Sequence, residues 1–365
     1  KLSAYGISGA AAAPAAPGAR DRIVFLSDVH IGQRNADGSP AGWFYGMYEV
    51  YLTIILFKVS MDCRVRELVF LGDLFATWMY PPEEKPQSVS EIISAWSGSL
   101  FMAPLLKCIA ALDAVYYIPG NHDMQVTQAD LAALTSGGKS IRLVTSSGYN
   151  ASARLRCGAQ FHVEHGNDGD FFNAPDDEHD SVQGLPFGYF VSRIVSAAED
   201  FDVESVFRTA YAKVLASDFV EKKGETADNR AGRLFVRFFL DAVIAWANTK
   251  REDGQKLGNS TVIVLPDGYT DVTIADVKQC YSSLLPQWLE SRQTYMFAAA
   301  GKSGLDRYAR KKFGEKGRFL WVSRLFSCAP PELVVIMGHT HFAKQERVMN
   351  REKQGIYANT GCVCQ

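Results

Sequence analysis

The chain lacks an apolar run long enough to cross a membrane. Its longest such run, Tyr51 to Phe57, is followed at once by Lys58, whereas a membrane span takes about 20 apolar residues. The start of the chain also lacks the charged-then-apolar pattern of a signal peptide. Residues 1–21 are rich in Ala, Gly and Pro instead. We therefore expect a flexible leader over 1–21 and a fold that forms in water.

An excess of charge of either sign is missing as well. Lys and Arg together number 38, and Asp and Glu number 40, so the net charge is -2. Such a balance gives no general attraction to nucleic acid or to an anionic membrane. An anionic substrate must therefore be held by local groups.

Cysteine is sparse, and its pattern excludes a small disulfide framework. The seven cysteines are odd in number and widely scattered, at Cys63, Cys108, Cys157, Cys280, Cys328, Cys362 and Cys364. A framework would show an even number at short spacings. We expect a reducing, cytoplasmic location. We interpret Cys362 and Cys364 as ordinary thiols, because two ligands alone do not make a zinc site.

What the chain does have is apolar material for a large core. It has 365 residues, of which 47% are hydrophobic, and this length suits one large domain with a sizeable insertion. Five strands are expected, at 22–26, 67–71, 114–118, 160–164 and 333–337. Residues 43–61 and 88–112 carry apolar residues at helical spacing between the first three. This alternation predicts βαβ units and a layered α/β fold.

Each expected strand is followed by a short motif that contains histidine, carboxylate or both. In chain order the motifs are Ser27-Asp28-Val29-His30, Gly72-Asp73, Gly120-Asn121-His122-Asp123, His165-Gly166-Asn167-Asp168 and Gly338-His339-Thr340-His341. Ligands of layered α/β folds gather at the carboxyl ends of the strands. We therefore expect these side chains to meet in one site of the kind that two-metal hydrolases use.

A phosphoester fits such a site, because it is anionic and resists attack by hydroxide. Two divalent cations about 3.5–4 Å apart neutralise it, lower the pKa of a bound water and hold the attacking and leaving oxygens in line. One carboxylate must bridge the cations, and Asp73 is the best candidate because it follows its strand alone. Mixed imidazole and carboxylate ligands favour Mn²⁺, with Fe or Zn²⁺ as alternatives.

The spacing of the other residues sorts them further. Asp28 and His30 lie two residues apart on an extended segment and can both reach one metal. Asn121 and His165 come from separate strands and suit the other metal. The two histidines of the last motif have the same two-residue spacing, so they can serve the two metals separately.

Each motif alone has an ordinary structural explanation. A lone histidine after a strand is more often a hydrogen-bonded structural residue than a ligand, and Gly-Asp or Gly-Asn pairs are commonest as turns. However, five of the seven histidines fall in the motifs, which chance seldom arranges. We interpret His162 as a core residue or a support for the ligands, and His179 as part of a solvated acidic loop.

Together the motifs resemble the signature of the calcineurin-like metallophosphoesterases, which runs Asp-x-His, Gly-Asp, Gly-Asn-His-Asp/Glu, His, Gly-His-x-His. The likeness covers most of 22–172 and 332–361. It implies a β-sandwich flanked by helices and a metal-dependent phosphoester or pyrophosphate hydrolase. It also implies one metal held by Asp28, His30, Asp73 and His341, and a second held by Asp73, Asn121, His165 and His339. His122 would then stabilise the developing charge and protonate the leaving oxygen, with Asp123 orienting its ring.

Residues 175–330 separate the last two motifs, and we expect them to form a helical cap inserted into a core of 22–174 and 331–365. Apolar spacing predicts helices at 187–200, 203–221, 230–250, 272–291 and 304–313. Thr273 and Asp276 resemble a capping pair for the fourth of these helices. The aromatic run 233–240 has two interpretations, a packed helical core and a lipid- or acyl-binding wall.

The cap is similar to the one that bacterial UDP-2,3-diacylglucosamine pyrophosphatases carry at this place, although those enzymes usually have Arg where this chain has His122. The alternatives are a nuclease-like DNA or nucleotide phosphodiesterase and a non-catalytic scaffold. We expect a phosphorylated small-molecule or lipid-linked substrate, selected by the cap, and no nucleic-acid partner. The basic segment 307–318 is interpreted as a solvated helix face, a clamp for a second phosphate or a peripheral contact with anionic lipid.

Overall fold

The structure is a computed structural model. It describes residues 20–34, 43–44, 46–150, 160–169, 171–175, 181–196, 203–216, 227–292, 333–339, 341, 344–350 and 353–362. Residues 1–19 of the expected leader, His179, the expected helix 304–313 and the basic segment 307–318 lie outside the described residues.

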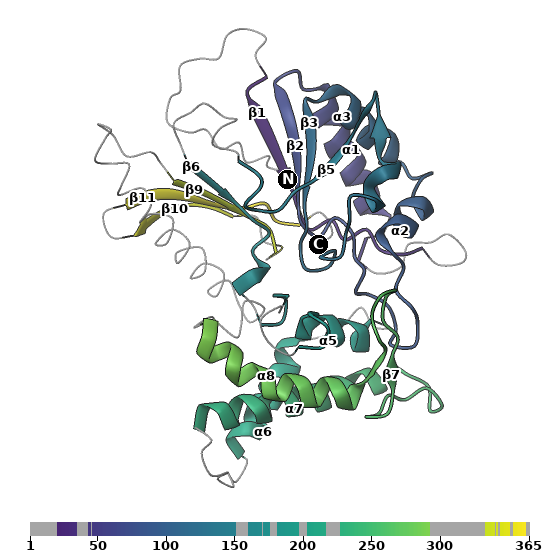
Figure 1. Cartoon of the computed structure of the whole chain (residues 1–365), viewed down its shortest axis with the longest axis vertical. Helices are drawn as coiled ribbons and strands as arrows, with labels where there is room; N and C mark the ends of the chain where they lie inside the picture. Colours follow the sequence, from purple (N-terminus) through teal and green to yellow (C-terminus); the bar gives the residue numbers. More distant parts are fainter. Residues whose placement is uncertain are drawn as a thin grey trace. The chain divides into compact units, whose positions relative to one another are not determined.

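The described residues form an α/β fold, as the alternation of strands and helices predicts. They contain seven α-helices and two larger sheets whose strands are mostly parallel (Figure 1). The helices are α1 (Met47–Met61), α2 (Val89–Ala95), α3 (Met102–Ala111), α5 (Phe187–Val195), α6 (Val203–Ala216), α7 (Ala227–Asn248) and α8 (Ile274–Arg292). The strands are β1 (Arg22–Leu26), β2 (Val65–Leu71), β3 (Ala114–Ile118), β4 (Thr135–Ser136), β5 (Lys139–Leu143), β6 (Gln160–Val163), β7 (Val262–Ile263), β8 (Val272–Thr273), β9 (Leu333–Met337), β10 (Lys344–Asn350) and β11 (Lys353–Asn359).

The first sheet has the strand order β1-β2-β3-β5-β4. Its first four strands run parallel, and only β4 is antiparallel to its neighbour. One face is covered by α1, α2 and α3, because Leu68 and Phe70 of β2 join a buried cluster with Leu52 of α1 and Leu105 of α3. Burial on both faces explains the unbroken apolar runs 68–71 of β2 and 114–118 of β3.

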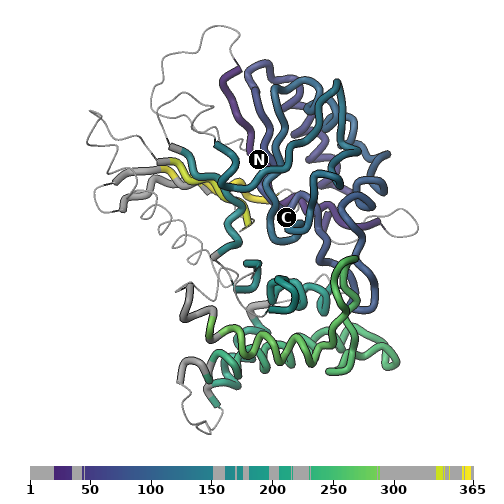
Figure 2. The backbone as a smooth tube through the Cα atoms, in the orientation of Figure 1, coloured from purple at the N-terminus to yellow at the C-terminus, as the bar shows by residue number. Residues whose placement is uncertain are grey.

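The second sheet has the order β10-β11-β9-β6, in which β6, β9 and β11 are parallel. Strands β6 and β9 are far apart in the chain but lie side by side (Figure 2). This sheet packs on the other face of the first one. Val69 and Leu71 of β2 share a buried cluster with Val163 of β6 and with Val334 and Ile336 of β9.

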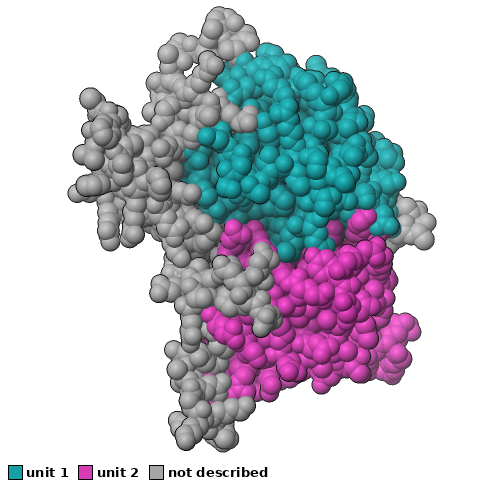
Figure 3. Space-filling model, viewed as in Figure 1, with its two compact units in different colours: residues 1–76, 89–166, 302–365 teal, residues 77–88, 167–301 magenta. Residues whose placement is uncertain are grey.

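The chain divides into two compact units (Figure 3). Unit 1 comprises 1–76, 89–166 and 302–365, and unit 2 comprises 77–88 and 167–301. Unit 1 contains both larger sheets, and unit 2 contains α5, α6, α7, α8 and the β7-β8 pair. The boundaries expected from the sequence, 175–330 for the insertion and 22–174 with 331–365 for the core, stay a prediction.

The interior of unit 2 is packed with aromatic side chains. Phe187 of α5 lies 5.1 Å from Phe172 and 5.2 Å from Tyr281 of α8, measured between ring centroids. Phe239 of α7 is buried and lies 5.4 Å from Phe172. The aromatic run 233–240 therefore contributes to a packed helical core, the first of its two interpretations.

A buried arginine ties the loop at 80–84 to this interior. Arg193 of α5 is 0% exposed. Its guanidinium donates hydrogen bonds to the carbonyl oxygens of Tyr80 at 2.8 Å, Pro81 at 2.9 Å, Glu84 at 2.6 Å and Val264 at 2.7 Å. One side chain thus satisfies several backbone acceptors that a buried loop would otherwise leave without donors.

Two details of the helices bear on the predictions. The capping pair of α8 is confirmed, since Thr273 Oγ1 donates to Asp276 Oδ2 at 2.6 Å and the Asp276 amide donates back at 3.2 Å. The single helical stretch expected at 88–112 is wrong in part, because the chain turns between α2 and α3. That turn contains Gly98, and glycine disfavours a helix interior. No described helix combines the length and the apolar character that crossing a membrane requires.

Candidate metal centre

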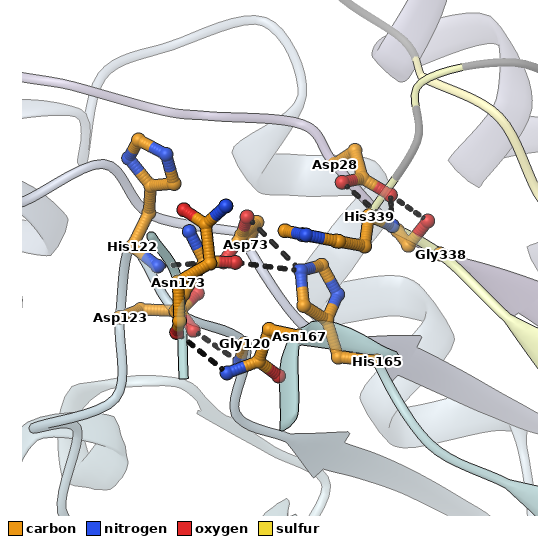
Figure 4. A network of polar contacts seen from close by, with 12 residues as sticks. Asp28, Asp73, Gly120, His122, Asp123, His165, Asn167, Asn173, Gly338 and His339 are labelled. Atoms are coloured by element: carbon orange, nitrogen blue, oxygen red, sulfur yellow. Dashed lines mark hydrogen bonds and ion pairs between the residues drawn. The ribbon is translucent and has the colours of Figure 1, made fainter. Parts of the chain in front are cut away.

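The predicted ligands come together at the carboxyl ends of the strands of unit 1. Asp28 and His30 follow β1, Asp73 follows β2, and His165 follows β6. Figure 4 shows the side chains of Asp28, Asp73, His165 and His339 gathered around one point, with Asp73 beside His165. The two sheets meet here, because the His339 amide, which follows β9, donates to Asp28 Oδ2, which follows β1, at 3.0 Å.

In the described part of the chain, three overlapping groups of side chains can hold a metal ion. They are Asp28 with His30 and His341, His30 with Asp73 and His122, and Asp73 with His165 and His339. Within each group the donor atoms lie within 4.8 Å of one another. Asp73 belongs to two of the groups, which is the position that a bridging carboxylate would need.

The first group is built on two histidine nitrogens that face each other. His30 Nε2 and His341 Nε2 are 3.0 Å apart, and His30 Nε2 lies 3.9 Å from Asp73 Oδ2. His341 Nε2 is 3.4 Å from Asp28 Oδ1. Asp28 and His30 are both 0% exposed. Two imidazoles and two carboxylates thus converge on a small buried volume.

The third group, Asp73 with His165 and His339, is centred on His165. Its Nδ1 donates a hydrogen bond to the Leu71 carbonyl at 2.9 Å, and this contact fixes the orientation of the ring. The opposite nitrogen, Nε2, lies 3.1 Å from Asp73 Oδ2 and 3.1 Å from Asn121 Oδ1. Nε2 therefore points at the same oxygens that would share a metal with it.

The carboxylate of Asp28 is fixed by donors from both ends of the chain. The His339 amide donates to its two oxygens at 3.1 Å and 3.0 Å. The Ser27 hydroxyl donates to Oδ2 and also contacts the Thr360 hydroxyl. The Cys362 thiol donates to the Asp28 carbonyl at 2.9 Å. These contacts hold the first and last motifs together.

Left-handed backbone conformations are concentrated at the predicted ligands. Six residues other than glycine have a positive φ in the described part of the chain. Five of them are predicted ligands, with φ of 52° at Asp28, 55° at His30, 53° at Asp73, 72° at His339 and 60° at His341. Such conformations cost about 1–3 kcal/mol each and cluster at functional sites. Their concentration here is an independent sign of a functional site.

Two motif glycines are required because atoms of other motifs lie where a side chain would begin. A Cβ at Gly120 would lie 2.7 Å from the Asp73 amide nitrogen, and one at Gly338 would lie 2.7 Å from Asp28 Oδ2. Real Cβ contacts essentially never come under 3.0 Å. Glycine at these positions therefore lets the carboxylates of Asp73 and Asp28 pass next to the backbone of other motifs.

Burial and neighbouring charges move the pKa values of the two carboxyl groups in opposite directions. Burial raises the pKa of Asp28, and the nearby His165 and His341 oppose this shift only in part. Burial acts on Asp73 too, but the charge of His165 above all, with its hydrogen bond to Asp73, outweighs burial and holds the pKa of Asp73 well below its usual value. Asp73 is thus the more firmly ionised carboxylate.

The pKa values of the histidines also move in opposite directions. Burial lowers the pKa of His30 and of His341, and it lowers the pKa of His122 to about 4. Burial also acts on His165, but the charge of Asp73 overcomes it and raises the pKa of His165 to about 10. The first three rings are neutral at pH 7 and offer lone pairs, while the surroundings of His165 favour a positive charge.

Asp123 makes several contacts within the site. Among the described residues, its carboxylate accepts hydrogen bonds from the Gly120 amide at 2.7 Å, the Phe75 amide at 3.1 Å and the Tyr117 hydroxyl. These contacts fix the loop that carries His122. The role of Asp123 in orienting the His122 ring stays a prediction. Burial above all raises the pKa of Asp123 to about 7.

His122 lies beside the predicted ligands. Its backbone amide donates to Asp73 Oδ1 at 2.8 Å, and its ring centroid is 4.7 Å from that of His30. It also belongs to one of the three groups that can hold a metal. The prediction that it is not a ligand therefore stays a prediction. His162 lies elsewhere, with its Nε2 2.6 Å from Glu164 Oε2.

The motifs did not reveal two further residues of the site. Trp43 lies against three of its histidines, with ring centroids 4.9 Å from His30, 5.4 Å from His122 and 6.1 Å from His341. No local pattern could have identified it. Tyr117 had a signal, because a tyrosine inside a buried strand needs a partner for its hydroxyl.

The donor set fits a divalent transition metal, since neutral imidazoles and ionised carboxylates are its usual ligands, and His165 would give up its proton to bind one. The buried clusters of histidine and aspartate can therefore hold a metal ion. A scan against protein-family models and a search of curated proteins gave no match for this chain.

Proposed function

We propose that unit 1 is the catalytic core of a dinuclear-metal phosphoester or pyrophosphate hydrolase of the calcineurin-like metallophosphoesterase kind. The observation that carries this proposal is the convergence of the motifs after β1, β2, β3, β6 and β9 on a single buried cluster. A chance set of surface motifs would not bring these side chains within metal-binding distance of one another. The packing of the two sheets through one apolar cluster agrees with the β-sandwich of that family.

The residues would divide between two metals as the resemblance implies. Asp28, His30 and His341 would hold the first, Asn121, His165 and His339 the second, and Asp73 would bridge them. The metals would supply charge neutralisation and an activated water for attack on phosphorus. Asp73 suits the bridging role because its pKa lies well below the usual value and it is 1% exposed.

His122 would act on the phosphoryl group from beside the metals. Burial makes its ring neutral at pH 7, so in that state it can donate an N–H hydrogen bond to the developing charge. To protonate the leaving oxygen it must first gain a proton, which the negative charge of a bound phosphate would favour. Asp123 and Tyr117 would hold the loop on which His122 sits.

Hydrolysis of simple aryl esters tests the proposal. We expect the purified chain to hydrolyse bis(p-nitrophenyl) phosphate or p-nitrophenyl phosphate when Mn²⁺ is present and to lose the activity with a chelator. Asp73→Asn should lower the rate more than loss of any other single ligand, because it removes the shared charge. Lys85→Gln is the matched control, since Lys85 is an exposed surface residue paired with Asp267. No turnover with Mn²⁺, Fe or Zn²⁺ would argue for the scaffold alternative, and turnover without metal would contradict the dinuclear-metal proposal.

A further inference from the structure

Helix α1 has an outward face made almost wholly of apolar side chains. The exposed members are Met47, Val50, Tyr51, Ile54, Phe57 and Met61, with exposed fractions between 37% and 59%. Lys58 is the one charged residue among the exposed positions of this helix. A surface helix ordinarily presents a polar face to water, so this arrangement requires an explanation.

The opposite face of α1 is already used by the core. Leu52, Leu56 and Val59 are buried in the cluster that joins the helix to the first sheet. The Leu56 carbonyl also accepts a hydrogen bond from the Cys108 thiol of α3 at 3.2 Å. The helix is therefore apolar on both sides, and among the described residues of unit 1 it is the inner side that is covered.

Exposed apolar side chains are concentrated on this helix. Nine large hydrophobic side chains are exposed in the described part of the chain, and six of them belong to α1. Leu100, which is 62% exposed, adjoins the same helix, because its amide donates to Glu49 Oε1 at 2.7 Å. That contact also occupies the one acidic side chain of α1. Scattered exposed apolar residues are normal, but a continuous patch marks an interaction site.

Basic groups border the patch. Lys107 of α3 places its Nζ 3.0 Å from Met61 Sδ and 5.5 Å from the centre of the Phe57 ring. Lys58 lies within the patch itself. Lysines that lie along apolar surface with their charge at its edge are typical of helices that rest in a lipid interface.

The size of the patch favours a membrane over a second copy of the chain. Six side chains of about 150–250 Å² each, exposed by about half, give about 450–750 Å². A stable dimer buries about 800 Å² on each partner. With 15 residues, α1 is about 22 Å long and is too short to span a bilayer, but it can lie in the interface plane.

We propose that the exposed face of α1 is a docking surface for a lipid bilayer that contains anionic lipid. The apolar side chains would enter the boundary between headgroups and acyl chains, and Lys58 and Lys107 would face the anionic headgroups. Binding should weaken as salt rises, because the lysine contribution is screened. This surface is separate from the candidate metal centre, and binding should persist in the presence of a metal chelator.

Vesicle flotation of the full chain tests the docking surface. The wild type should float with vesicles of phosphatidylcholine mixed with phosphatidylglycerol and bind pure phosphatidylcholine more weakly. Changing Ile54 and Phe57 together to Glu should lower the partition at least about tenfold. Lys58→Ala should lower it about fivefold on the anionic vesicles alone. Tyr211→Glu is the matched control, because Tyr211 is 52% exposed on α6, and it should bind like the wild type.

Other results would overturn the proposal. A wild type that stays with the soluble fraction excludes a lipid surface. Equal binding by the wild type and by the Ile54 and Phe57 double variant would place the contact elsewhere. Gel filtration without vesicles tests for a second copy of the chain on this face. A wild-type dimer that becomes a monomer in the double variant would show that a second copy occupies it. Circular dichroism checks that the variants keep their helices, and Lys58→Ala serves if the double variant does not fold.

Discussion

Single residues of the candidate centre adopt backbone conformations that the rest of unit 1 must hold in place. Asp28, His30 and Asp73 all have φ near +50°, and each follows a parallel strand of the first sheet. Amides from other motifs then fix the carboxylates, as the His339 amide does for Asp28. Contacts within the chain therefore hold these carboxylates in place, which lowers the entropic cost of assembling a site.

Two substrates with different leaving groups can distinguish the possible roles of His122. A general acid matters most for a poor leaving group and typically contributes about 10²–10⁴-fold. If His122 protonates the leaving oxygen, His122→Ala should lose far more activity on an alkyl phosphoester than on a p-nitrophenyl ester. Steady-state rates on both substrates, with metal content measured in parallel, decide this. Equal losses would indicate electrostatic stabilisation, and loss of metal would make His122 a ligand.

Trp43 provides a spectroscopic signal from the centre. Its ring lies 4.9 Å from that of His30, so a cation bound there would be close enough to perturb the indole. We expect Mn²⁺ or Co²⁺ to change the tryptophan fluorescence of the wild type, and Trp43→Phe to remove most of that change. Trp246→Phe, in unit 2, is the control and should keep it. An unchanged titration in Trp43→Phe would mean that the metal binds away from His30.

At the scale of elements, the loop at 80–84 depends on Arg193 of α5. Replacing a buried donor leaves several carbonyl groups without partners, and each such group costs about 1–3 kcal/mol. We expect Arg193→Met to lower the free energy of unfolding of unit 2 by about 3 kcal/mol or more, measured by urea denaturation. Arg237→Met on the exposed side of α7 should change it little. A small effect at Arg193 would mean that water replaces the guanidinium.

The elements that the sequence predicts well are those with a strong local pattern. The strand at 114–118 has the predicted bounds, and the capping pair Thr273–Asp276 forms as expected. Strands β10 and β11 were not predicted, because residues such as Lys344, Gln345 and Glu346 have no apolar alternation and depend on pairing with neighbours. Short strands such as β4 give too few residues for any periodicity.

The sequence predicts which residues form the candidate site, but not their backbone conformations or the contacts that support them. The order of the motifs and their positions after strands place the ligands at one edge, and the structure brings them together. The positive φ values, the Tyr117 contact with Asp123 and the Trp43 contacts arise from segments distant in sequence. Such long-range contacts leave no periodic signal, so a single sequence cannot reveal them.

At the scale of the whole molecule, the expected role of residues 175–330 is to choose the substrate. Replacing them with a short linker should leave some turnover of a small aryl phosphoester, because the predicted ligands lie outside this range. Selectivity among nucleotides, sugar nucleotides and lipid phosphates should be lost. A substrate screen of both forms measures this. An unchanged profile would assign the insertion to stability or assembly.

The central claim is that the strand-end motifs hold two metal ions, and the metal content of the protein tests it most directly. The metal is removed from the wild type and from Asp73→Asn with a chelator, and both are dialysed against Mn²⁺. Elemental analysis by inductively coupled plasma mass spectrometry then gives the number of metal ions per chain. We predict about two Mn²⁺ per chain for the wild type and a clear loss for the variant, because Asp73 would serve both sites. Fewer than about one metal per wild-type chain, after Fe and Zn²⁺ have also been tried, would contradict the claim.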